Sequence, residues 1–339
     1  MRLHLHIGHG KTGSSYLQSW LACNAALMAQ QTGVLYPLQS SRLESLGERA
    51  KQGRFSMGNG YVLQEFFKQP ERPRLWLRRL RQQAGVSRQQ LQGVMFSFEG
   101  WTKQLDSLID PLLPVADRWG VERVEVLLMV RDPLDHACSL YNQMVKRHGY
   151  SGTLDEWLSD YSFSARLLRA LELIEKHADR LRLTVVHYGR QRSQVLQCLH
   201  SWLGFDPALA WLPPPEVSVN RSLSWDELQL MRYLNQRIGS ASAPVGEAFV
   251  DRLPDVSAAV LRPSPEAIAA FAARWEEVVD GINSHLPEEA ALESMKPLPL
   301  HAVSPNAEVP LFHLTDEQIH CLVDGLLAIK DCSPAVSQD

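Results

Sequence analysis

The stretch LHLHIGHGKTGSSYLQSWL, residues 3–21, decides the fold that this sequence predicts. Its apolar residues Leu3, Leu5 and Ile7 alternate with polar ones, which is the pattern of a β-strand. After the glycine-rich turn GHGKTG, apolar residues recur at helical spacing, so a helix is expected over residues 14–29. A strand, a glycine turn and a helix in succession indicate the opening of an α/β fold.

Strands and helices alternate along the rest of the chain. Further strands are expected at residues 34–37, 94–100, 123–133 and 181–189, and further helices at 134–146, 193–204, 224–238, 264–284 and 315–329. This alternation predicts a central parallel sheet flanked by helices, whose ligands bind at the carboxyl ends of the strands. We expect an α/β core over residues 1–205, a helical C-terminal part over 206–330 packed on the same domain, and a flexible tail over 331–339.

The composition fits a soluble globular protein, since 45% of the 339 residues are apolar. The net charge is −4, so no overall basic field attracts nucleic acid, and any anion site must be local. The five cysteines contain no C-x-x-C pair, which argues against a zinc site or a disulfide framework. With no signal-peptide pattern and no run of 18 apolar residues, the protein is expected to be cytoplasmic and without an integral membrane segment.

The glycine turn matches two common nucleotide motifs only in part. Gly8, Gly10 and Gly13 satisfy the spacing of a dinucleotide fingerprint, but that site needs an acidic residue roughly 20 positions on to hold the ribose. The first acidic residue of the chain is Glu44. A nicotinamide dinucleotide site is therefore not favoured.

The end of a P-loop motif is also present, in Gly10-Lys11-Thr12. Leu5, inside the first strand, occupies the position of the other glycine that the motif requires, so the loop is too short to wrap a triphosphate. Arg131 stands where a magnesium-binding Asp would be wanted at the end of the strand 123–133. These departures weigh against a kinase-like site.

A pair of separate anion sites explains the same departures. The segment Lys11-Thr12-Gly13-Ser14-Ser15 offers backbone N–H groups, three hydroxyls and one ammonium to a single anion at a helix N-terminus. Arg131 and Ser139, eight residues later on the following helix, offer a cation and a hydroxyl to a second anion. Two anion sites describe a 3′,5′-bisphosphorylated adenosine better than they describe ATP.

The two segments together resemble a known family. GKTGSSYLQ followed by VRDPLDHACSLYNQ is similar to the paired signatures of P-loop-like sulfotransferases of bacterial type, which use 3′-phosphoadenosine 5′-phosphosulfate (PAPS). There a Lys-[ST]-Gly-[ST]-[ST] loop takes the 5′-phosphosulfate and an Arg-x7-Ser segment takes the 3′-phosphate. The resemblance covers the two signatures well, residues 1–205 in outline and the remainder loosely. It implies transfer of a sulfuryl group, without a metal, from PAPS to a hydroxyl, less often an amine, of a carbohydrate, glycolipid or other small acceptor.

The resemblance also implies roles for individual residues. Lys11 would neutralise the charge that grows on the leaving phosphate, and Ser139 would contact Lys11 until the acceptor binds. The remaining cofactor-binding residues would be Thr12, Gly13, Ser14 and Ser15 at the 5′ end, Tyr16 and Tyr188 beside the adenine, Arg131 at the 3′-phosphate, and Asn220 and Arg221 in a loop that closes over it.

A general base is needed to take the acceptor's proton, and Glu99 is the candidate. It follows a buried apolar strand, and its place between the two signatures resembles the segment that carries the base in related enzymes. Burial there would raise its pKa. A Glu that caps or forms an ion pair at the strand end is the alternative interpretation; His136, His148 and His187 are weaker candidates.

Two functions outside this interpretation stay open. One is a P-loop kinase-like nucleotide phosphotransferase, and the other is a non-catalytic protein that binds adenosine bisphosphate. Simple binding would not require Lys11 together with Glu99. The acceptor-binding loops are expected within residues 40–90, 147–165 and 240–262.

Two further features have ordinary explanations beside functional ones. His4 and His6 fall on one face of the first strand as a metal pair would, but without a third ligand in view a structural role is favoured. The stretch 71–83 is basic and amphipathic, with Leu75 and neighbouring apolar residues available for a core face. Its arginines are expected to form a solvated face, and the alternative is that they steer an anionic acceptor.

Overall fold

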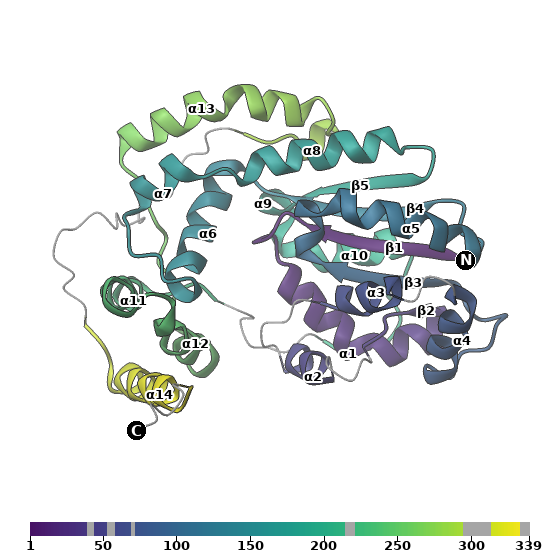
Figure 1. Ribbon diagram of the computed structural model, residues 1–339, viewed down its shortest axis with the longest axis horizontal. Coiled ribbons are helices and arrows are strands. Elements are labelled where there is room, and N and C mark those ends of the chain that lie inside the picture. The colour runs from purple at the N-terminus through teal and green to yellow at the C-terminus, as the bar shows by residue number, and fades with distance from the viewer. Residues whose placement is uncertain (39–43, 53–57, 69–71, 214–220, 294–312, 333–339) are drawn as a thin grey trace, which may run out of the picture. The chain divides into compact units, whose positions relative to one another are not determined.

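Five parallel strands form a central sheet in the computed structural model (Figure 1), which describes residues 1–38, 44–52, 58–68, 72–213, 221–293 and 313–332. The strands are β1 (Arg2–Gly8), β2 (Val34–Leu35), β3 (Gly93–Phe98), β4 (Val124–Val130) and β5 (Leu181–His187). Their order is β2-β3-β1-β4-β5, so the first strand lies in the middle of the sheet. The expected fold class, a central parallel sheet flanked by helices, is confirmed.

Helices make up most of the remaining described chain. The α-helices are α1 (Ser14–Thr32), α2 (Glu44–Lys51), α3 (Gly60–Phe67), α4 (Pro73–Gln83), α5 (Leu105–Trp119), α6 (Pro133–Arg147), α7 (Leu154–Asp160), α8 (Phe163–Lys176), α9 (Tyr188–Gln191), α10 (Val195–Leu203), α11 (Trp225–Ile238), α12 (Ala243–Arg252), α13 (Pro265–Asn283) and α14 (Asp316–Cys332). Short 3-10 helices are η1 (Glu99–Lys103), η2 (Arg192–Gln194), η3 (Gly239–Ser242) and η4 (Glu288–Ala290). Every strand and helix expected from the sequence has a counterpart, with ends that differ by a few residues.

The chain divides into two compact units, and each is described here by itself. The first unit comprises Met1–Arg131, Ser162–Glu216 and Glu277–Leu292, and the second comprises Asp132–Tyr161, Val217–Glu276 and Glu293–Asp339. This division does not follow the boundary expected near residue 205, because the units interleave along the sequence. The packing of residues 206–330 on the core stays a prediction. Helix α14 continues to Cys332, and the rest of the expected tail lies outside the described residues.

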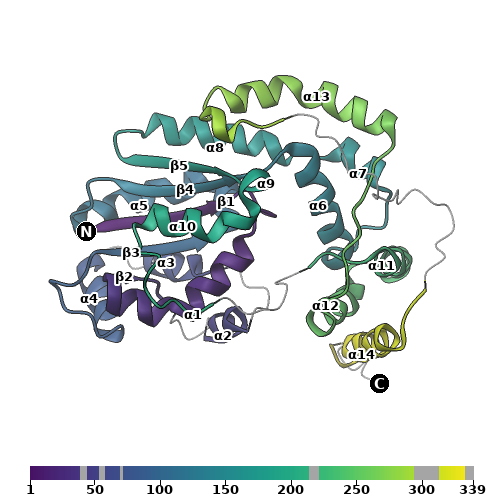
Figure 2. The same cartoon turned by 180° about the vertical axis from the view of Figure 1, so that it is seen from behind.

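The first unit has an apolar core on one face of the sheet. Strand residues such as Met95, Leu127 and Met129 pack there against α1 and α10, whose Trp20 and Leu199 are almost fully buried. Figure 2 shows α1 and α10 on the near side of the sheet, and Figure 1, from the opposite side, shows α5 in front. Both faces of the sheet are thus covered, as a parallel sheet requires.

The pairing of the strands brings their carboxyl ends to one edge of the sheet. Ile7 of β1 is paired with Phe98 of β3, and Gly8 is paired with Met129 of β4. On the other side of β4, Val130 is paired with His187 of β5. The segments that follow β1, β3, β4 and β5 therefore start at the same edge, and all of them carry residues that the sequence analysis selected.

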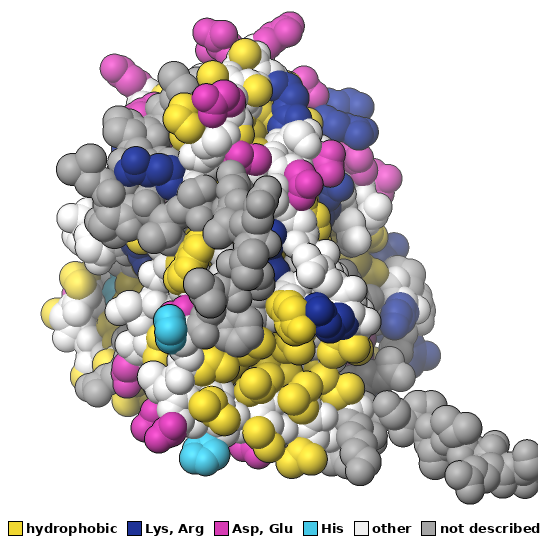
Figure 3. Space-filling model, turned by 90° about the vertical axis from the view of Figure 1, so that its left-hand side faces the viewer, with side chains coloured by type: hydrophobic (Ala, Val, Ile, Leu, Met, Phe, Trp, Pro, Cys, Tyr) yellow, Lys and Arg dark blue, Asp and Glu magenta, His cyan; other side chains and the backbone are white. Residues whose placement is uncertain are grey.

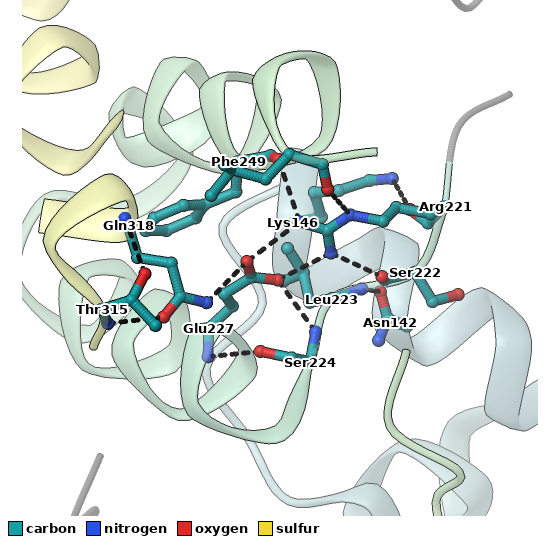
Figure 4. A network of polar contacts seen from close by, with 11 residues as sticks. Asn142, Lys146, Arg221, Ser222, Leu223, Ser224, Glu227, Phe249, Thr315 and Gln318 are labelled. Carbon is teal, nitrogen blue, oxygen red and sulfur yellow. Dashed lines mark hydrogen bonds and ion pairs between the residues drawn. The ribbon is translucent and has the colours of Figure 1, made fainter. Parts of the chain in front are cut away.

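The second unit is held together by a buried polar network (Figure 4). The guanidinium of Arg221 forms two hydrogen bonds to the Glu227 carboxylate, of 2.7 and 2.9 Å, and both side chains are almost fully buried. Glu227 also accepts hydrogen bonds from the Ser224 backbone and the Gln318 side chain. Because Ser224 caps α11 and Gln318 belongs to α14, the network joins these two helices. Ser224 and Glu227 also form a capping box at the start of α11.

The outer surface of α14 is apolar. Four of its large hydrophobic residues are more than a third exposed: Ile319, Val323, Leu326 and Leu327. Figure 3 shows hydrophobic side chains clustered in the lower part of this face of the molecule. Helix α14 lies at the same height in Figure 1. Among the described residues, no helix combines the length and the apolar character that crossing a bilayer demands.

Candidate functional site

The loop between β1 and α1 has an unusual backbone. Gly10 and Gly13 have φ values of 69° and 80°, and Lys11 between them has a φ of 52°. Within the described part of the chain, Lys11 is the only non-glycine residue in this left-handed region. For a residue with a Cβ atom this conformation costs about 1–2 kcal/mol, and such strain gathers at functional sites. The surroundings of the loop hold Lys11 in this conformation.

Two hydroxyl groups of the loop are buried without a hydrogen-bond partner. Thr12 is 0% exposed and Ser14 is 1% exposed, and neither side-chain oxygen has a partner among the described residues. An unsatisfied buried polar group costs about 1–3 kcal/mol. Both hydroxyls stand at the N-terminus of α1, whose first turn has no acidic residue, and the positive end of the helix dipole favours an anion there. A bound anion would satisfy these donors together.

Arg131 joins the loop from the end of β4. Its Nη1 donates a hydrogen bond of 2.8 Å to the carbonyl oxygen of Lys11, and its guanidinium lies 5.6 Å from the centre of the Tyr188 ring. Tyr188 also packs closely on Gly13, because a Cβ atom added to Gly13 would lie 2.7 Å from the ring. Four residues selected from the sequence, two in the first loop and one each after β4 and β5, therefore lie together.

Glu99 stands beside the same loop, as the first residue of η1 directly after β3. A Cβ atom added to Gly8, the last residue of β1, would lie 3.2 Å from Cγ of Glu99 and 2.8 Å from Oγ of Ser14. The absence of a side chain at Gly8 thus lets Glu99 and Ser14 approach the strand end from two sides. The Thr102 hydroxyl donates to the Gly8 carbonyl and fixes the turn that carries Glu99.

A lysine near Glu99 is electrostatically coupled to it. Burial and the Arg166 guanidinium lower the pKa of Lys103, and the Glu99 carboxylate raises it. The Lys103 ammonium also lies 4.6 Å from the centre of the Phe163 ring. Glu99 is half-buried, and its role as a base stays a prediction, as does the alternative of an ion-paired residue at the strand end.

Ser15 and Tyr16, the two remaining candidates near the loop, lie in the first turn of α1. Tyr16 is half-buried and packs against the hydrophobic core under α1, and burial raises the pKa of its hydroxyl. Ser15 is also half-buried. The position of Tyr16 beside an adenine stays a prediction.

Ser139 and His136 belong to the second unit, on helix α6. Ser139 is half-buried, and its contact with Lys11 stays a prediction. His136 is 1% exposed and its Nδ1 lies 2.7 Å from the Tyr161 hydroxyl, a hydrogen-bond distance. This buried contact gives His136 a structural role in the packing of α6.

The structure gives Arg221 an internal role. All five of its N–H donors are used: Nε by Leu253, Nη1 by Ser222 and Glu227, and Nη2 by Glu227 and Phe249. A phosphate could bind this guanidinium only by displacing one of these partners. The cofactor contact expected of Arg221, whose internal hydrogen bonds are drawn in Figure 4, stays a prediction, and Asn220 lies outside the described residues.

The histidines of β1 form part of a buried polar layer. Nδ1 of His6 lies 2.9 Å from the Ser97 hydroxyl, which also accepts a hydrogen bond from Gln18. The ring of His4 meets Trp202 edge to face at 5.1 Å. Burial lowers the pKa of His6 to about 4, and burial together with Arg2 does the same for His4. Within the described ranges, no group of three or more potential metal ligands occurs. The contacts of His6 with Ser97 and of His4 with Trp202 agree with the structural role that was favoured.

Sequence reasoning missed this polar layer and the contacts of Thr102. Part of the signal was present in the sequence, because His4 and His6 are two positions apart and so share one face of β1. In the structure, Ser97 of the neighbouring strand β3 is paired with His6. Only the pairing register, which the sequence does not state, brings His6 and Ser97 within hydrogen-bond distance.

Comparison with known proteins adds little to this geometry. No protein-family model and no curated protein matches the sequence. Among solved structures, a crystal structure of a sulfotransferase from Alicyclobacillus acidocaldarius is similar, with 13% identity over 84% of this chain and 95% of that chain. The TM-score is 0.41, which is too low to carry an argument, so the function is argued from the residues of this chain.

Proposed function

We propose that this protein is a PAPS-dependent sulfotransferase that acts on a hydroxyl, less often an amine, of a carbohydrate, glycolipid or other small acceptor. The observation that carries the proposal is the pair of buried, unpartnered hydroxyls of Thr12 and Ser14 at a helix N-terminus, beside Lys11. Such an arrangement suits a single anionic group. Arg131, which contacts the same loop, supplies the cation for a second one.

The loop and the residues around it bind different parts of PAPS in this proposal. When bound, PAPS supplies a sulfuryl group carried on its 5′-phosphate. Thr12, Gly13, Ser14 and Ser15 hold the 5′ end through hydroxyls and backbone N–H groups, and Arg131 with Ser139 holds the 3′-phosphate. Tyr188 and Tyr16 bind the adenine. The packing of Tyr188 on Gly13 supports its place in this set.

Lys11 and Glu99 carry the transfer itself. The bond between sulfur and the phosphate oxygen breaks as a new bond forms between sulfur and the acceptor oxygen. The Lys11 ammonium neutralises the charge that develops on the leaving phosphate, so it acts most strongly late in the reaction. The acceptor's proton passes to the Glu99 carboxylate. The closeness of Glu99 and Ser14 at Gly8 supports this division of roles.

The proposal is tested by comparing ligands before any acceptor is known. We expect adenosine 3′,5′-bisphosphate to raise the thermal midpoint, and a ligand at 100 times its dissociation constant adds about 2.7 kcal/mol to stability. Adenosine 5′-monophosphate, which lacks the 3′-phosphate, should stabilise less. ATP with magnesium and NADH serve as the competing ligands.

Each other outcome identifies a different protein. Stabilisation by ATP with magnesium but not by the bisphosphate would point to a kinase-like phosphotransferase and overturn the proposal. Binding of the bisphosphate without transfer of radioactive sulfate from PAPS to any member of a panel of phenols, sugars and glycolipids would point to a non-catalytic binding protein. Transfer that disappears in Lys11→Ala would support the sulfotransferase.

A further inference from the structure

Helix α4 belongs to the first unit and packs on the rest of that unit through an aromatic face. The Trp76 ring stacks on Trp119 at 5.8 Å with an interplanar angle of 7°, and it lies 4.5 Å from the Phe66 ring. Leu80, one turn later on the same face, is buried. Leu75 was expected on this core face, but the structure corrects that expectation, because Leu75 is 38% exposed. The helix therefore packs Trp76 and Leu80 on its inner face and exposes Leu75 on its outer face.

The outer face of α4 is basic around that leucine. By helical periodicity, Leu75 lies at the centre of the outer face with Arg78 and Arg79 on either side of it. Arg72 and Arg74, near the start of the helix, extend the same surface, and all four arginines are exposed. We call Arg72, Arg74, Leu75, Arg78 and Arg79 the α4 patch.

The arginines of the α4 patch outnumber the acidic residues of the surrounding sequence. From residue 71 to residue 98 the sequence contains six arginines and one acidic residue, Glu71, although the whole chain has a net charge of −4. Among the residues that the structure describes, Arg72, Arg78 and Arg79 form no ion pair, and Arg74 donates only to the Arg118 carbonyl. The patch is thus complementary to an anionic partner.

We propose that the α4 patch binds the anionic surface of a lipid bilayer. Guanidinium groups pair with lipid phosphates in bidentate geometry, and several of them near an anionic surface add their contributions. Leu75 is surrounded by these arginines, so it enters the boundary between headgroups and acyl chains when they bind. A nucleic acid or an acidic glycan would use the arginines but would gain nothing from the leucine. The exposed leucine at the centre of the patch therefore favours a bilayer over a polyanionic chain.

This surface is remote from the proposed active site within the first unit. The Trp119 indole donates to the Pro73 carbonyl at the start of α4, and Trp119 ends the helix that leads to the amino end of β4. Figure 1 shows α4 at the end of the sheet where the N-terminus lies, whereas the loop of Lys11 follows the carboxyl end of β1. Changes in the α4 patch should leave nucleotide binding intact, so the two proposals fail or hold separately.

The test is sedimentation of the full-length protein with vesicles. We expect binding to vesicles of phosphatidylcholine with phosphatidylglycerol, weak binding to phosphatidylcholine alone, and release at high salt. The fourfold variant Arg72→Gln, Arg74→Gln, Arg78→Gln and Arg79→Gln should reduce the partition coefficient at least about tenfold. The control carries Arg169→Gln and Arg192→Gln, at two other exposed arginines of the first unit, and should bind as the unchanged protein does.

Leu75→Gln separates a bilayer from a polyanionic chain. It should weaken binding to anionic vesicles several-fold while any binding to duplex DNA or heparin stays the same. The proposal is overturned if the unchanged protein does not bind anionic vesicles at low salt, if the arginine variants bind equally well, or if Leu75→Gln has no effect on vesicles. If the fourfold variant does not fold, as judged by its thermal unfolding, the double variant Arg78→Gln and Arg79→Gln decides.

Discussion

The guanidinium of Arg131 donates a hydrogen bond to the backbone carbonyl of Lys11, although 120 positions of sequence separate them. This contact connects the two segments that resemble sulfotransferase signatures. It also bears on the strained backbone of Lys11, because Arg131 holds the carbonyl that follows the left-handed φ angle. Arg131 therefore has a part in the shape of the loop as well as in its charge.

Replacing Lys11 separates its charge from its backbone conformation. Lys11→Ala and Lys11→Gly should both lower turnover by about 100- to 1000-fold, because each removes the ammonium. Glycine tolerates a φ of 52°, so the Gly variant should be more stable than the Ala variant by about 1 kcal/mol. Turnover assays and urea unfolding of the two variants measure these effects. Near-normal turnover in either variant would remove Lys11 from the mechanism.

Replacing Arg131 tests its assignment to the 3′-phosphate. Arg131→Gln should weaken the binding of adenosine 3′,5′-bisphosphate by at least about tenfold, which is the typical size for losing a charge-assisted hydrogen bond. Binding of adenosine 5′-monophosphate should change much less. Calorimetric titration of both ligands gives the comparison. An equal loss for the two ligands would mean that Arg131 acts on the loop alone.

Replacing Glu99 tests the proposed base. Glu99→Gln keeps the size of the side chain but removes the proton acceptor, so turnover should fall by about 100-fold or more while the affinity for adenosine 3′,5′-bisphosphate stays unchanged. The rise of turnover with pH that a carboxylate base produces should also disappear. Lost affinity together with unchanged turnover would instead make Glu99 a structural residue of the strand end.

The buried histidines predict a loss of stability in acid. Burial lowers the pKa of His4 and of His6 to about 4 in the folded protein, from 6.5 in the unfolded chain. The unfolded chain therefore binds more protons below pH 6.5, and the free energy of unfolding should fall as the pH drops from about 6.5 to about 4. Each histidine accounts for at most about 3 kcal/mol of this fall.

Substituting one of the two histidines provides the control. His6→Gln keeps a polar partner for Ser97 and should reduce the slope of stability against pH in that window by up to one proton. The same substitution at the exposed His313 should leave the slope unchanged. Urea unfolding at several pH values gives the slope. Equal slopes for His6→Gln and the unchanged protein would contradict the assignment.

The ion pair of the second unit predicts a large and unequal effect of two substitutions. Burial alone would raise the pKa of Glu227, but the hydrogen bonds from Arg221, Ser224 and Gln318 hold it below its usual value. Glu227→Gln leaves Arg221 buried without its counterion and should cost about 3–5 kcal/mol. Gln318→Ala removes one hydrogen bond to a charged group and should cost about 1.5–3 kcal/mol. Denaturant unfolding would contradict this ranking if Gln318→Ala were the more harmful change.

Much of the first unit was predictable, because its strands are apolar runs and its helices end at glycines. The helix that opens the fold was expected to end at residue 29 and continues to Thr32, before Gly33 with a φ of 69°. The helix α10 ends before Gly204, close to the expected boundary. The meeting of Lys11, Arg131 and Tyr188 also followed from the sequence, since parallel strands end at one edge of the sheet.

Other parts could not be read from the pattern. Helix α5 was not predicted, because Pro111 and Pro114 lie inside it and proline is typical of helix ends. The structure nevertheless contains both prolines within a continuous helix. The segments expected as acceptor loops contain the helices α2, α3, α4, α7 and α12. The capping box of Thr153 and Glu156 was a signal for α7.

The pairing of Arg221 with Glu227 was hidden for a different reason. The two residues are six positions apart, at the start of α11, and only tertiary packing decides whether such a cation faces a ligand or an internal carboxylate. The left-handed backbone of Lys11 could not be predicted either, because a positive φ angle is typical of glycine and not of lysine.

The interleaving of the two units affects how the protein can be dissected. The chain passes from one unit to the other five times, and one passage falls between Arg131 and Asp132, within the segment that resembles a single binding signature. No single cut of the polypeptide separates one unit from the other. Any single cut leaves at least one of the two units incomplete in both fragments, so the contribution of either unit is best measured by point substitutions in the intact chain.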